Sequence, residues 1–320
     1  MSNGAAFKSY LEGDALRLGS RLAVRFHKTL RVPDDDKSYP LPPTFGPFRL
    51  YRAADYQGRV PESWVVEDAL FFPMYQREAM WLGFLAVWWK PNALMIGADG
   101  VNVVSGEAWE ASLSAEPQNY LVAPDQPWLD GIKTQAETVR QFVAVALGAG
   151  YTIGEQLRPG AATQGVQFRV YEPRPGLFPD SEPEPQGGVL STGMRSPAMG
   201  IGAGGAIRQK IVQDRYGVGT WDLAKPATAI VYIVNGELFE SLTGEPPPPT
   251  PISAEEYTRR GFPWFDLYEE SSGIAAPGLL QGVKSVSEID SARFPGKAPE
   301  NSVDITAAQV RKIRRRKKHS

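Results

Sequence analysis

The chain has no cysteine, and this absence removes several classes of chemistry at once. Disulfide bonds, thiolate zinc sites, iron–sulfur clusters and cysteine nucleophiles all need that side chain. Because disulfides are most frequent in secreted proteins, a chain without cysteine favours the reducing interior of the cell. We therefore expect a cytoplasmic protein.

Histidine is almost as scarce, since only His27 and His319 occur among 320 residues. A zinc site needs several nitrogen, sulfur or carboxylate ligands, so a zinc enzyme is not expected. A Ser-His-Asp triad would have to use His27, but no G-x-S-x-G motif accompanies it. We expect no metal and no cofactor, and we interpret His27 as an exposed or edge-strand residue.

Long hydrophobic runs are also missing. The most apolar stretch, residues 79–89, is followed at once by Lys90-Pro91-Asn92. A helix of that length cannot cross the roughly 30 Å of hydrocarbon in a bilayer. Residues 1–19 lack the basic start and apolar run of a signal peptide. We interpret residues 79–89 as core and expect no integral membrane segment.

The net charge of −2 is unevenly distributed. Arg311, Lys312 and residues 314–318 carry seven positive charges, so the remainder carries about −9 (−2 minus 7). The basic run Arg311–Lys318 could contact a weak anionic partner, such as nucleic acid, anionic lipid or an acidic protein surface. The alternative is a solvated tail without a specific partner.

Short apolar segments between turn residues favour strands. Asp99-Gly100 lies between two apolar runs and favours a type I′ turn, which predicts a hairpin over residues 93–105. Further strands are predicted at the following positions: residues 20–32, 48–53, 119–123, 139–147, 166–171, 206–212 and 227–235. The spacing indicates a mainly β protein whose first domain is an antiparallel β-sandwich or jelly roll.

Composition divides the chain further. Residues 1–19 are expected to form a flexible N-terminal arm and residues 20–172 the β-sandwich domain. The Pro- and Glu-rich residues 173–188 read as a linker. Residues 189–300 are expected to form a smaller α+β region, and residues 301–320 a basic helical tail. Helices are predicted after the capping residue Ser253 and at residues 285–292 and 304–318.

Several motifs resemble those of a family of uncharacterised proteins from bacteria and some fungi. They are FPMYQREAMW at residues 72–81, DQPWLDGI at 125–132, VRQFV at 139–143, GAGG at 202–205 and PWFDLY at 263–268. The resemblance covers most of the chain outside the linker and tail. It implies no activity, so it assigns no functional residue.

Two other motifs have weak functional readings. Residues 200–205 match G-x-G-x-x-G, but no strand is predicted directly before them, so a flexible turn entering a strand is favoured over a dinucleotide site. Residues 34–36 and Asp99 could ligate calcium, but their spacing is not that of an EF-hand. A solvated acidic turn is the favoured interpretation.

The segment from Asp125 to Asp130 is the strongest candidate for a site. Two carboxylates and Gln126 flank Trp128 on a proline-containing loop, and sugars are bound by an aromatic face together with carboxylates or amides. Paired carboxylates also hydrolyse glycosidic bonds when they lie about 5–10 Å apart. The alternative is a structural turn with Trp128 packed into the core.

Charged residues also lie within apolar segments. Because a buried charge needs a partner, Glu78 is expected to pair with Arg140 or Arg77 across neighbouring strands. The functional alternative is a polar pocket in which Arg140 meets an anionic ligand.

These observations predict a non-enzymatic ligand- or protein-binding or assembly protein. Its ligand-binding residues would be Asp125, Gln126, Trp128, Asp130 and Arg140, and its partner a protein, a carbohydrate or a second copy of the chain. One alternative is a carboxylate-dependent hydrolase acting on carbohydrate, with Asp125, Asp130 or Glu78 as acid and base. Another is a scaffold tethered to nucleic acid or anionic membrane by its basic tail.

Overall fold

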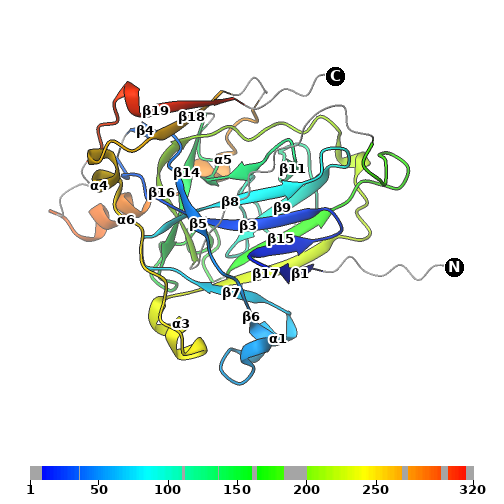
Figure 1. Ribbon diagram of the computed structural model, residues 1–320, viewed down its shortest axis with the longest axis horizontal. Helices are drawn as coiled ribbons and strands as arrows, with labels where there is room; N and C mark the ends of the chain where they lie inside the picture. The colour runs from blue at the N-terminus through cyan, green and yellow to red at the C-terminus, as the bar shows by residue number, and fades with distance from the viewer. Residues whose placement is uncertain are drawn as a thin grey trace.

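The computed structural model of the chain describes residues 9–35, 37–109, 112–135, 137–160, 164–183, 200–268, 273–296 and 302–314. This part of the chain is mainly β structure, arranged as two large, open, mixed sheets in which antiparallel pairs predominate (Figure 1). The expectation of a mainly β protein is therefore confirmed.

The first sheet has ten strands within the described residues. Seven of them lie side by side in this order: β1 (Ser9–Glu12), β2 (Ala15–Leu18), β3 (Leu22–Thr29), β8 (Ala79–Ala86), β14 (Thr138–Val145), β16 (Gly200–Arg208) and β4 (Ser38–Tyr39). Three short strands pair with β3, β8 and β14 respectively: β5 (Thr44–Pro47), β12 (Trp128–Leu129) and β13 (Gly131–Ile132). Only the contact of β16 with β4 is parallel among these pairs.

The second sheet has seven strands in the same part of the chain. Six follow one another across the sheet: β10 (Val101–Asn102), β9 (Asn92–Ala98), β15 (Val166–Tyr171), β17 (Ala227–Val234), β7 (Leu70–Pro73) and β6 (Tyr51–Arg52). The short strand β11 (Leu121–Ala123) pairs with β9. A separate two-stranded parallel sheet joins β18 (Trp264–Tyr268) and β19 (Val310–Arg314).

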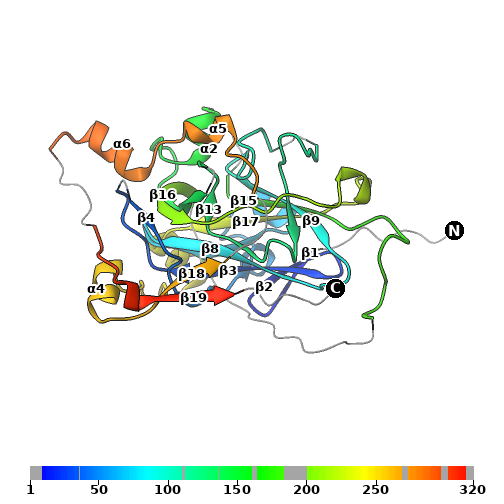
Figure 2. The ribbon, with the colours of Figure 1, turned by 90° about the horizontal axis from the view of Figure 1, so that it is seen from above.

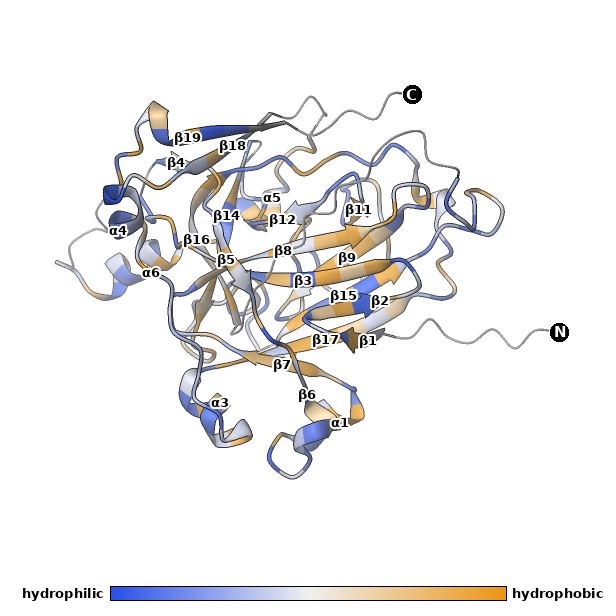
Figure 3. Cartoon of the chain, viewed as in Figure 1, coloured by the Kyte–Doolittle hydropathy of each residue, from blue (hydrophilic) through white to orange (hydrophobic). Residues whose placement is uncertain are grey.

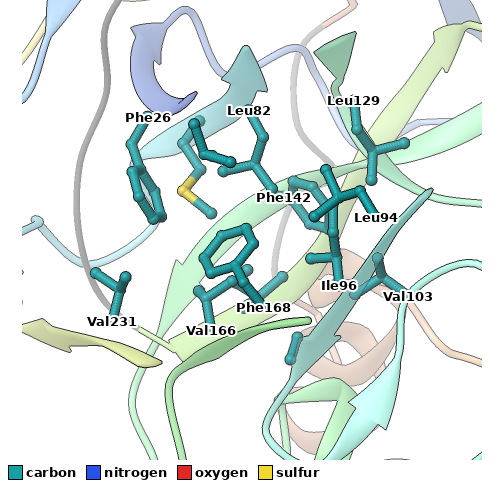
Figure 4. Close-up of a cluster of buried hydrophobic side chains, with 14 of the residues drawn as sticks. Phe26, Leu82, Leu94, Ile96, Val103, Leu129, Phe142, Val166, Phe168 and Val231 are labelled. Atoms are coloured by element: carbon teal, nitrogen blue, oxygen red, sulfur yellow. The ribbon is translucent and has the colours of Figure 1, made fainter. Parts of the chain in front are cut away.

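One large hydrophobic cluster joins the buried faces of the two sheets (Figure 4). Phe26, Leu82 and Phe142 come from the first sheet, whereas Ile96 and Phe168 come from the second. These side chains are fully buried, and Phe26 meets Phe168 edge to face at 5.7 Å between ring centroids. Burial of such apolar side chains stabilises the fold by about 1.5–3 kcal/mol each.

Helices are short and lie around the sheets (Figure 2). The α-helices are α1 (Glu62–Val66), α2 (Ile153–Leu157), α3 (Gly236–Thr243), α4 (Ala254–Arg259), α5 (Gly278–Gln281) and α6 (Val286–Arg293), and the 3₁₀ turns are η1 (Ala53–Tyr56), η2 (Val218–Thr220) and η3 (Ala307–Gln309). Ser253 and Ser285 cap α4 and α6 by accepting hydrogen bonds from backbone N–H groups, which confirms both predicted helix starts. No helix among the described residues is long and apolar enough to span a membrane.

The hairpin predicted over residues 93–105 is confirmed in its turn and its first strand. Asp99 and Gly100 both have positive φ, at 49° and 79°, between the antiparallel strands β9 and β10. Such φ values are those of a type I′ turn, which explains why Asp-Gly stands there.

The expectation of a loose arm over residues 1–19 is wrong for residues 9–18, which form the hairpin of β1 and β2. Leu16 and Leu18 are buried in the main core, and Gly13 supplies the positive φ of 58° at the turn. The Leu-Arg-Leu alternation at residues 16–18 was the local signal of a half-buried strand.

The division of the chain at residues 173–188 does not separate two bodies in the structure. Beyond it, β16 pairs with β14 in the first sheet, and β17 lies between β15 and β7 in the second. Residues 173–183 lie against the body, where Lys90 forms an ion pair with Asp180; residues 184–188 fall outside the described chain. Local composition did not predict that strands on both sides of residues 173–188 share the same sheets, because the pairing of strands depends on segments that are distant in sequence.

The glycine-rich residues 200–205 form paired β strand, which corrects the expected turn. A Cβ atom at Gly204 would lie 2.3 Å from Val143 Cγ2, and one at Gly205 would lie 2.0 Å from the carbonyl oxygen of Pro33. The glycines therefore serve close backbone packing. No helix follows this strand directly, so the arrangement lacks the helix N-terminus that a dinucleotide site requires.

Candidate functional site

The loop between β11 and β12 is held in place by the buried side chain of Gln126. Its amide nitrogen donates a hydrogen bond to the backbone oxygen of Trp128 at 2.8 Å, and its amide oxygen accepts one from the backbone N–H of Val212 at 2.8 Å. Gln126 is 1% exposed. Both ends of its amide are used within the chain, so the side chain fixes the loop to the segment after β16.

Trp128 and Asp130 are joined directly. The indole N–H of Trp128 donates to Asp130 Oδ2 at 2.7 Å, and the backbone N–H of Asp130 donates to the side-chain oxygen of Gln209 at 2.9 Å. Trp128 is half-buried and packs against a second hydrophobic cluster that contains Trp264. Because Asp130 is 4% exposed, its carboxylate serves the loop itself rather than a solvent-facing site.

Asp125 is the most accessible acidic residue of this loop. It forms an ion pair with Arg215, with 2.9 Å between Asp125 Oδ2 and Arg215 Nε. The guanidinium of Arg215 also lies over the ring of Tyr216, with 4.9 Å between Cζ and the ring centroid, which is within cation–π range. This pair forms a polar contact at the surface, where ion pairs add little stability.

Arg140 lies on β14, where its backbone is opposite Ile132 of β13, but its side chain meets residues outside the Asp125–Asp130 segment. Its guanidinium lies 3.3 Å from Asp34 and 3.3 Å from Glu288, and the backbone N–H of Ser287 donates to Asp34 at 2.8 Å. Burial raises the pKa of Asp34, although the Ser287 bond and Arg140 act in the opposite direction. These contacts dock the start of α6 on the sheet. The expected solvated acidic turn is therefore wrong at Asp34, which is buried; Asp36 lies outside the described residues.

The predicted pairing of Glu78 with Arg140 or Arg77 is also wrong. Arg77 pairs instead with Asp290 of α6, with 2.8 Å between its nitrogen and the carboxylate oxygen. Glu78 accepts a hydrogen bond from the backbone N–H of Tyr75 at 3.0 Å. Burial raises the pKa of Glu78 to about 7, although the backbone bond and the charge of Lys28 lower it in part.

His27 lies in the middle of the first sheet, not on an exposed edge. It is 1% exposed, and its ring stacks on that of Trp81 with 3.7 Å between centroids. A Cβ atom at Gly83 would lie 2.6 Å from His27 Nε2, so the glycine makes room for the imidazole. At His27, β3 is paired with β5 on one side and with β8 on the other, and this pairing could not be predicted from the local sequence.

The three acidic residues named for the hydrolase alternative meet different groups. Within the structure's described ranges, Asp125 pairs with Arg215, Asp130 accepts a hydrogen bond from the Trp128 indole N–H, and Glu78 accepts one from the backbone N–H of Tyr75. The same ranges contain no group of three or more histidine, cysteine or acidic residues that could hold a metal ion.

A different surface gathers exposed aromatic side chains. Phe45 of β5 and Phe262 after α4 are 40% and 41% exposed, and both contact the buried ring of Tyr257. The ring centroids lie 6.0 Å and 5.1 Å from that of Tyr257. We call Phe45, Tyr257 and Phe262 the aromatic patch. The sequence signal was weak, since Phe45 and Phe262 stand beside glycine and proline far apart in the chain.

The basic strand β19 begins close to α4, the helix that carries Tyr257 of this patch (Figure 1). The side-chain amide of Gln309, directly before β19, donates to the backbone oxygens of Thr258 at 3.0 Å and Phe262 at 3.5 Å. The α-helix expected over residues 304–318 is thus wrong for residues 304–314, of which 307–309 form the 3₁₀ turn η3 and 310–314 form β19; residues 315–318 fall outside the described chain. The β-branched Val310 and Ile313 favour strand over helix, and pairing with β18 fixes that choice.

Comparison with known proteins gives no relative: no family model, curated protein or solved structure matches the chain.

Proposed function

We propose that the chain is a non-catalytic protein-binding or assembly protein, and that the aromatic patch is the centre of its recognition surface. The observation that carries the proposal is the exposure of Phe45 and Phe262, both of which contact the buried Tyr257. Aromatic side chains held by a rigid neighbour lose little freedom on binding and dominate many protein interfaces.

The rigidity of the patch supports this role. Tyr257 donates its hydroxyl hydrogen bond to the backbone oxygen of Pro263 at 3.0 Å, and Trp264 packs beneath it with 6.1 Å between ring centroids. In the proposal, the two open sheets form an antiparallel β-sandwich that carries this patch on a fixed support. Preorganised side chains give affinity because binding does not have to order them.

The polar residues named from the sequence support a structural role more than a ligand site. Gln126 and Asp130 are buried and bonded within the loop, and Arg140 holds α6 to the sheet. The proposed surface is therefore placed at the aromatic patch instead of at Asp125–Asp130. No contact among the described residues favours the carbohydrate hydrolase, because Asp125, Asp130 and Glu78 are each bonded to a different group.

The test uses the full chain in two measurements: light scattering after gel filtration, and binding to an array of purified proteins and glycans. We expect self-association or binding to at least one arrayed protein. Phe45→Ala with Phe262→Ala should weaken that interaction about tenfold or more, because removal of a central aromatic anchor costs on the order of 2 kcal/mol.

Phe294→Ala is the matched control, because Phe294 is 57% exposed but lies at the end of α6 away from the patch contacts. Its substitution should leave the interaction unchanged. A strictly monomeric chain that binds nothing on the array would overturn the proposal. So would an equal loss in the control and in the patch variant.

A further inference from the structure

The strand β19 is an edge with one side unpaired in the described part of the chain. It pairs with β18 in parallel, in the register Trp264 with Val310 through Tyr268 with Arg314. No other strand among the described residues pairs with β19. Figures 1 and 2 show it at the margin of the molecule. The outer backbone N–H and C=O groups of an edge strand can form a further ladder.

This edge is firmly supported. Beneath it, β18 exchanges two backbone hydrogen bonds with Leu41: Leu41 N–H donates to Phe265 at 2.7 Å, and Phe265 N–H donates to Leu41 at 3.0 Å. Directly before β19, the side-chain amide of Gln309 donates a hydrogen bond to the backbone oxygen of Thr258, and its amide oxygen accepts one from the backbone N–H of Thr306. A partner strand would thus meet an extended template that is already formed.

The charge on the edge is positive, and the described part of the chain supplies no partner for it. Arg311 and Lys312 are exposed, and neither makes a hydrogen bond or ion pair among the described residues. The nearest strand position to Lys312 is Asp266, but that carboxylate pairs with Arg208 at 3.0 Å. Figure 3 shows β19 as a hydrophilic strand beside the apolar sheets.

Successive residues of a strand point to opposite faces, so Arg311 and Lys312 place one cation on each face of the edge. A basic strand would be repelled by these cations, and a neutral strand would gain no charge attraction from them. The two cations therefore limit unspecific pairing at this edge. A strand with acidic residues at two consecutive positions would meet an opposite charge on both faces. A second copy of β19 is disfavoured because its cations would repel these.

We propose that the edge of β19 binds an extended acidic segment of a partner protein by strand addition. The inference rests on the proposed binding function and names the partner's chemistry. The backbone ladder supplies the binding geometry, and Arg311 with Lys312 selects for acidic sequences.

The test uses the full chain and a fluorescein-labelled twelve-residue peptide with a central Val-Asp-Glu-Val and flanking threonines, measured by fluorescence polarisation. A second peptide carries the same residues with N-methylated backbone amides at alternate positions. We expect the first peptide to bind and the second to bind at least tenfold more weakly, because N-methylation removes ladder donors while it keeps the charge.

Substitution of the cations provides the second arm. Arg311→Gln with Lys312→Gln should weaken binding of the acidic peptide about tenfold, whereas Lys225→Gln, an exposed lysine elsewhere, should not change it. A peptide with Asn and Gln in place of Asp and Glu should bind the unsubstituted chain as weakly as the acidic peptide binds the Arg311→Gln, Lys312→Gln variant. Equal binding of the N-methylated peptide would overturn strand addition, and stronger binding to single-stranded DNA or to phosphatidylserine vesicles would assign the cations to those partners instead.

The outcomes separate this inference from the proposed function. If the array or light-scattering interaction depends on Phe45 and Phe262 but the acidic peptide does not bind, only the strand-addition inference fails. If the peptide binds through Arg311 and Lys312 while the array and light scattering are silent, the aromatic patch loses its proposed role.

Discussion

The side chain of Glu78 allows the free-energy cost of burying a charged group in this fold to be measured. It is 9% exposed, and burial raises its pKa from the ordinary 4.5 to about 7. Since a tenfold change in proton affinity corresponds to about 1.36 kcal/mol, the ionised side chain destabilises the native state by up to roughly 3 kcal/mol. Glu78→Gln removes this charge and can still accept the Tyr75 hydrogen bond.

The sign follows from linkage. Between about pH 4.5 and pH 7 the native state holds the Glu78 proton that the unfolded chain has lost, so stability falls as pH rises through this window. Below it, both states are protonated and the effect vanishes. The free energy of unfolding of Glu78→Gln, relative to the natural chain, should therefore be higher at pH 8 than at pH 5 by about 2–3 kcal/mol.

Urea unfolding of both chains at pH 5 and pH 8, followed by tryptophan fluorescence, measures how the difference between their free energies of unfolding changes with pH. Other buried acids such as Asp99, whose pKa burial also raises to about 7, are present in both chains and cancel. Glu240→Gln, on the exposed side of α3, is the control and should show no pH-dependent gain. A gap below about 0.5 kcal/mol for Glu78→Gln would refute the reasoning, because the carboxylate would then be solvated in the native state.

Three further substitutions test the packing. Gly205→Ala should lower the free energy of unfolding by about 1–3 kcal/mol or more, because its Cβ would lie 2.0 Å from the Pro33 oxygen. The control Gly219→Ala, with open space around the added Cβ, should change it by no more than about 0.5 kcal/mol. Equal values for the two variants in urea unfolding would contradict the close approach at Gly205. Phe168→Ala should cost about 3–5 kcal/mol in the same assay, and a cost under 1 kcal/mol would mean that the shared core is not formed as described. Trp128→Phe should cost about 1–3 kcal/mol, because the buried Asp130 loses the indole donor, and an unchanged midpoint in urea would show that this bond is not formed.

Local patterns predicted the strands better than their partners. Asp99-Gly100 specified its own turn, and residues 166–171 showed the alternation of β15, because both signals lie within a few residues. The pairing of β17 with β7 joins residues more than 150 positions apart, and nothing local encodes it. The basic residues around 311–318 suggested a helix on composition, but tertiary pairing with β18 decided the conformation of residues 310–314.

The candidate site was harder to predict than the fold. Asp125, Gln126, Trp128 and Asp130 do lie together, as their adjacency in sequence required, but their hydrogen bonds point within the loop and to residues after β16. Arg140 is next to them along the sheet, yet it turns to Asp34 and Glu288. Which groups a polar side chain meets depends on distant segments, and the aromatic patch likewise joins two segments, around Phe45 and around residues 257–262, that lie far apart in the sequence.

The placement of β16 and β17 beyond residues 173–188 determines the order in which this protein can complete its structure during synthesis. In the first sheet, β4 has β16 as its neighbour, and in the second, β17 joins β15 to β7. A nascent chain that ends before residue 200 therefore holds both halves of its hydrophobic interior without the strands that close them. The first sheet lacks β16 until the chain has been synthesised through Arg208, and the second lacks β17 until Val234 has been added, so until then the unpaired strand edges need protection from neighbouring nascent chains.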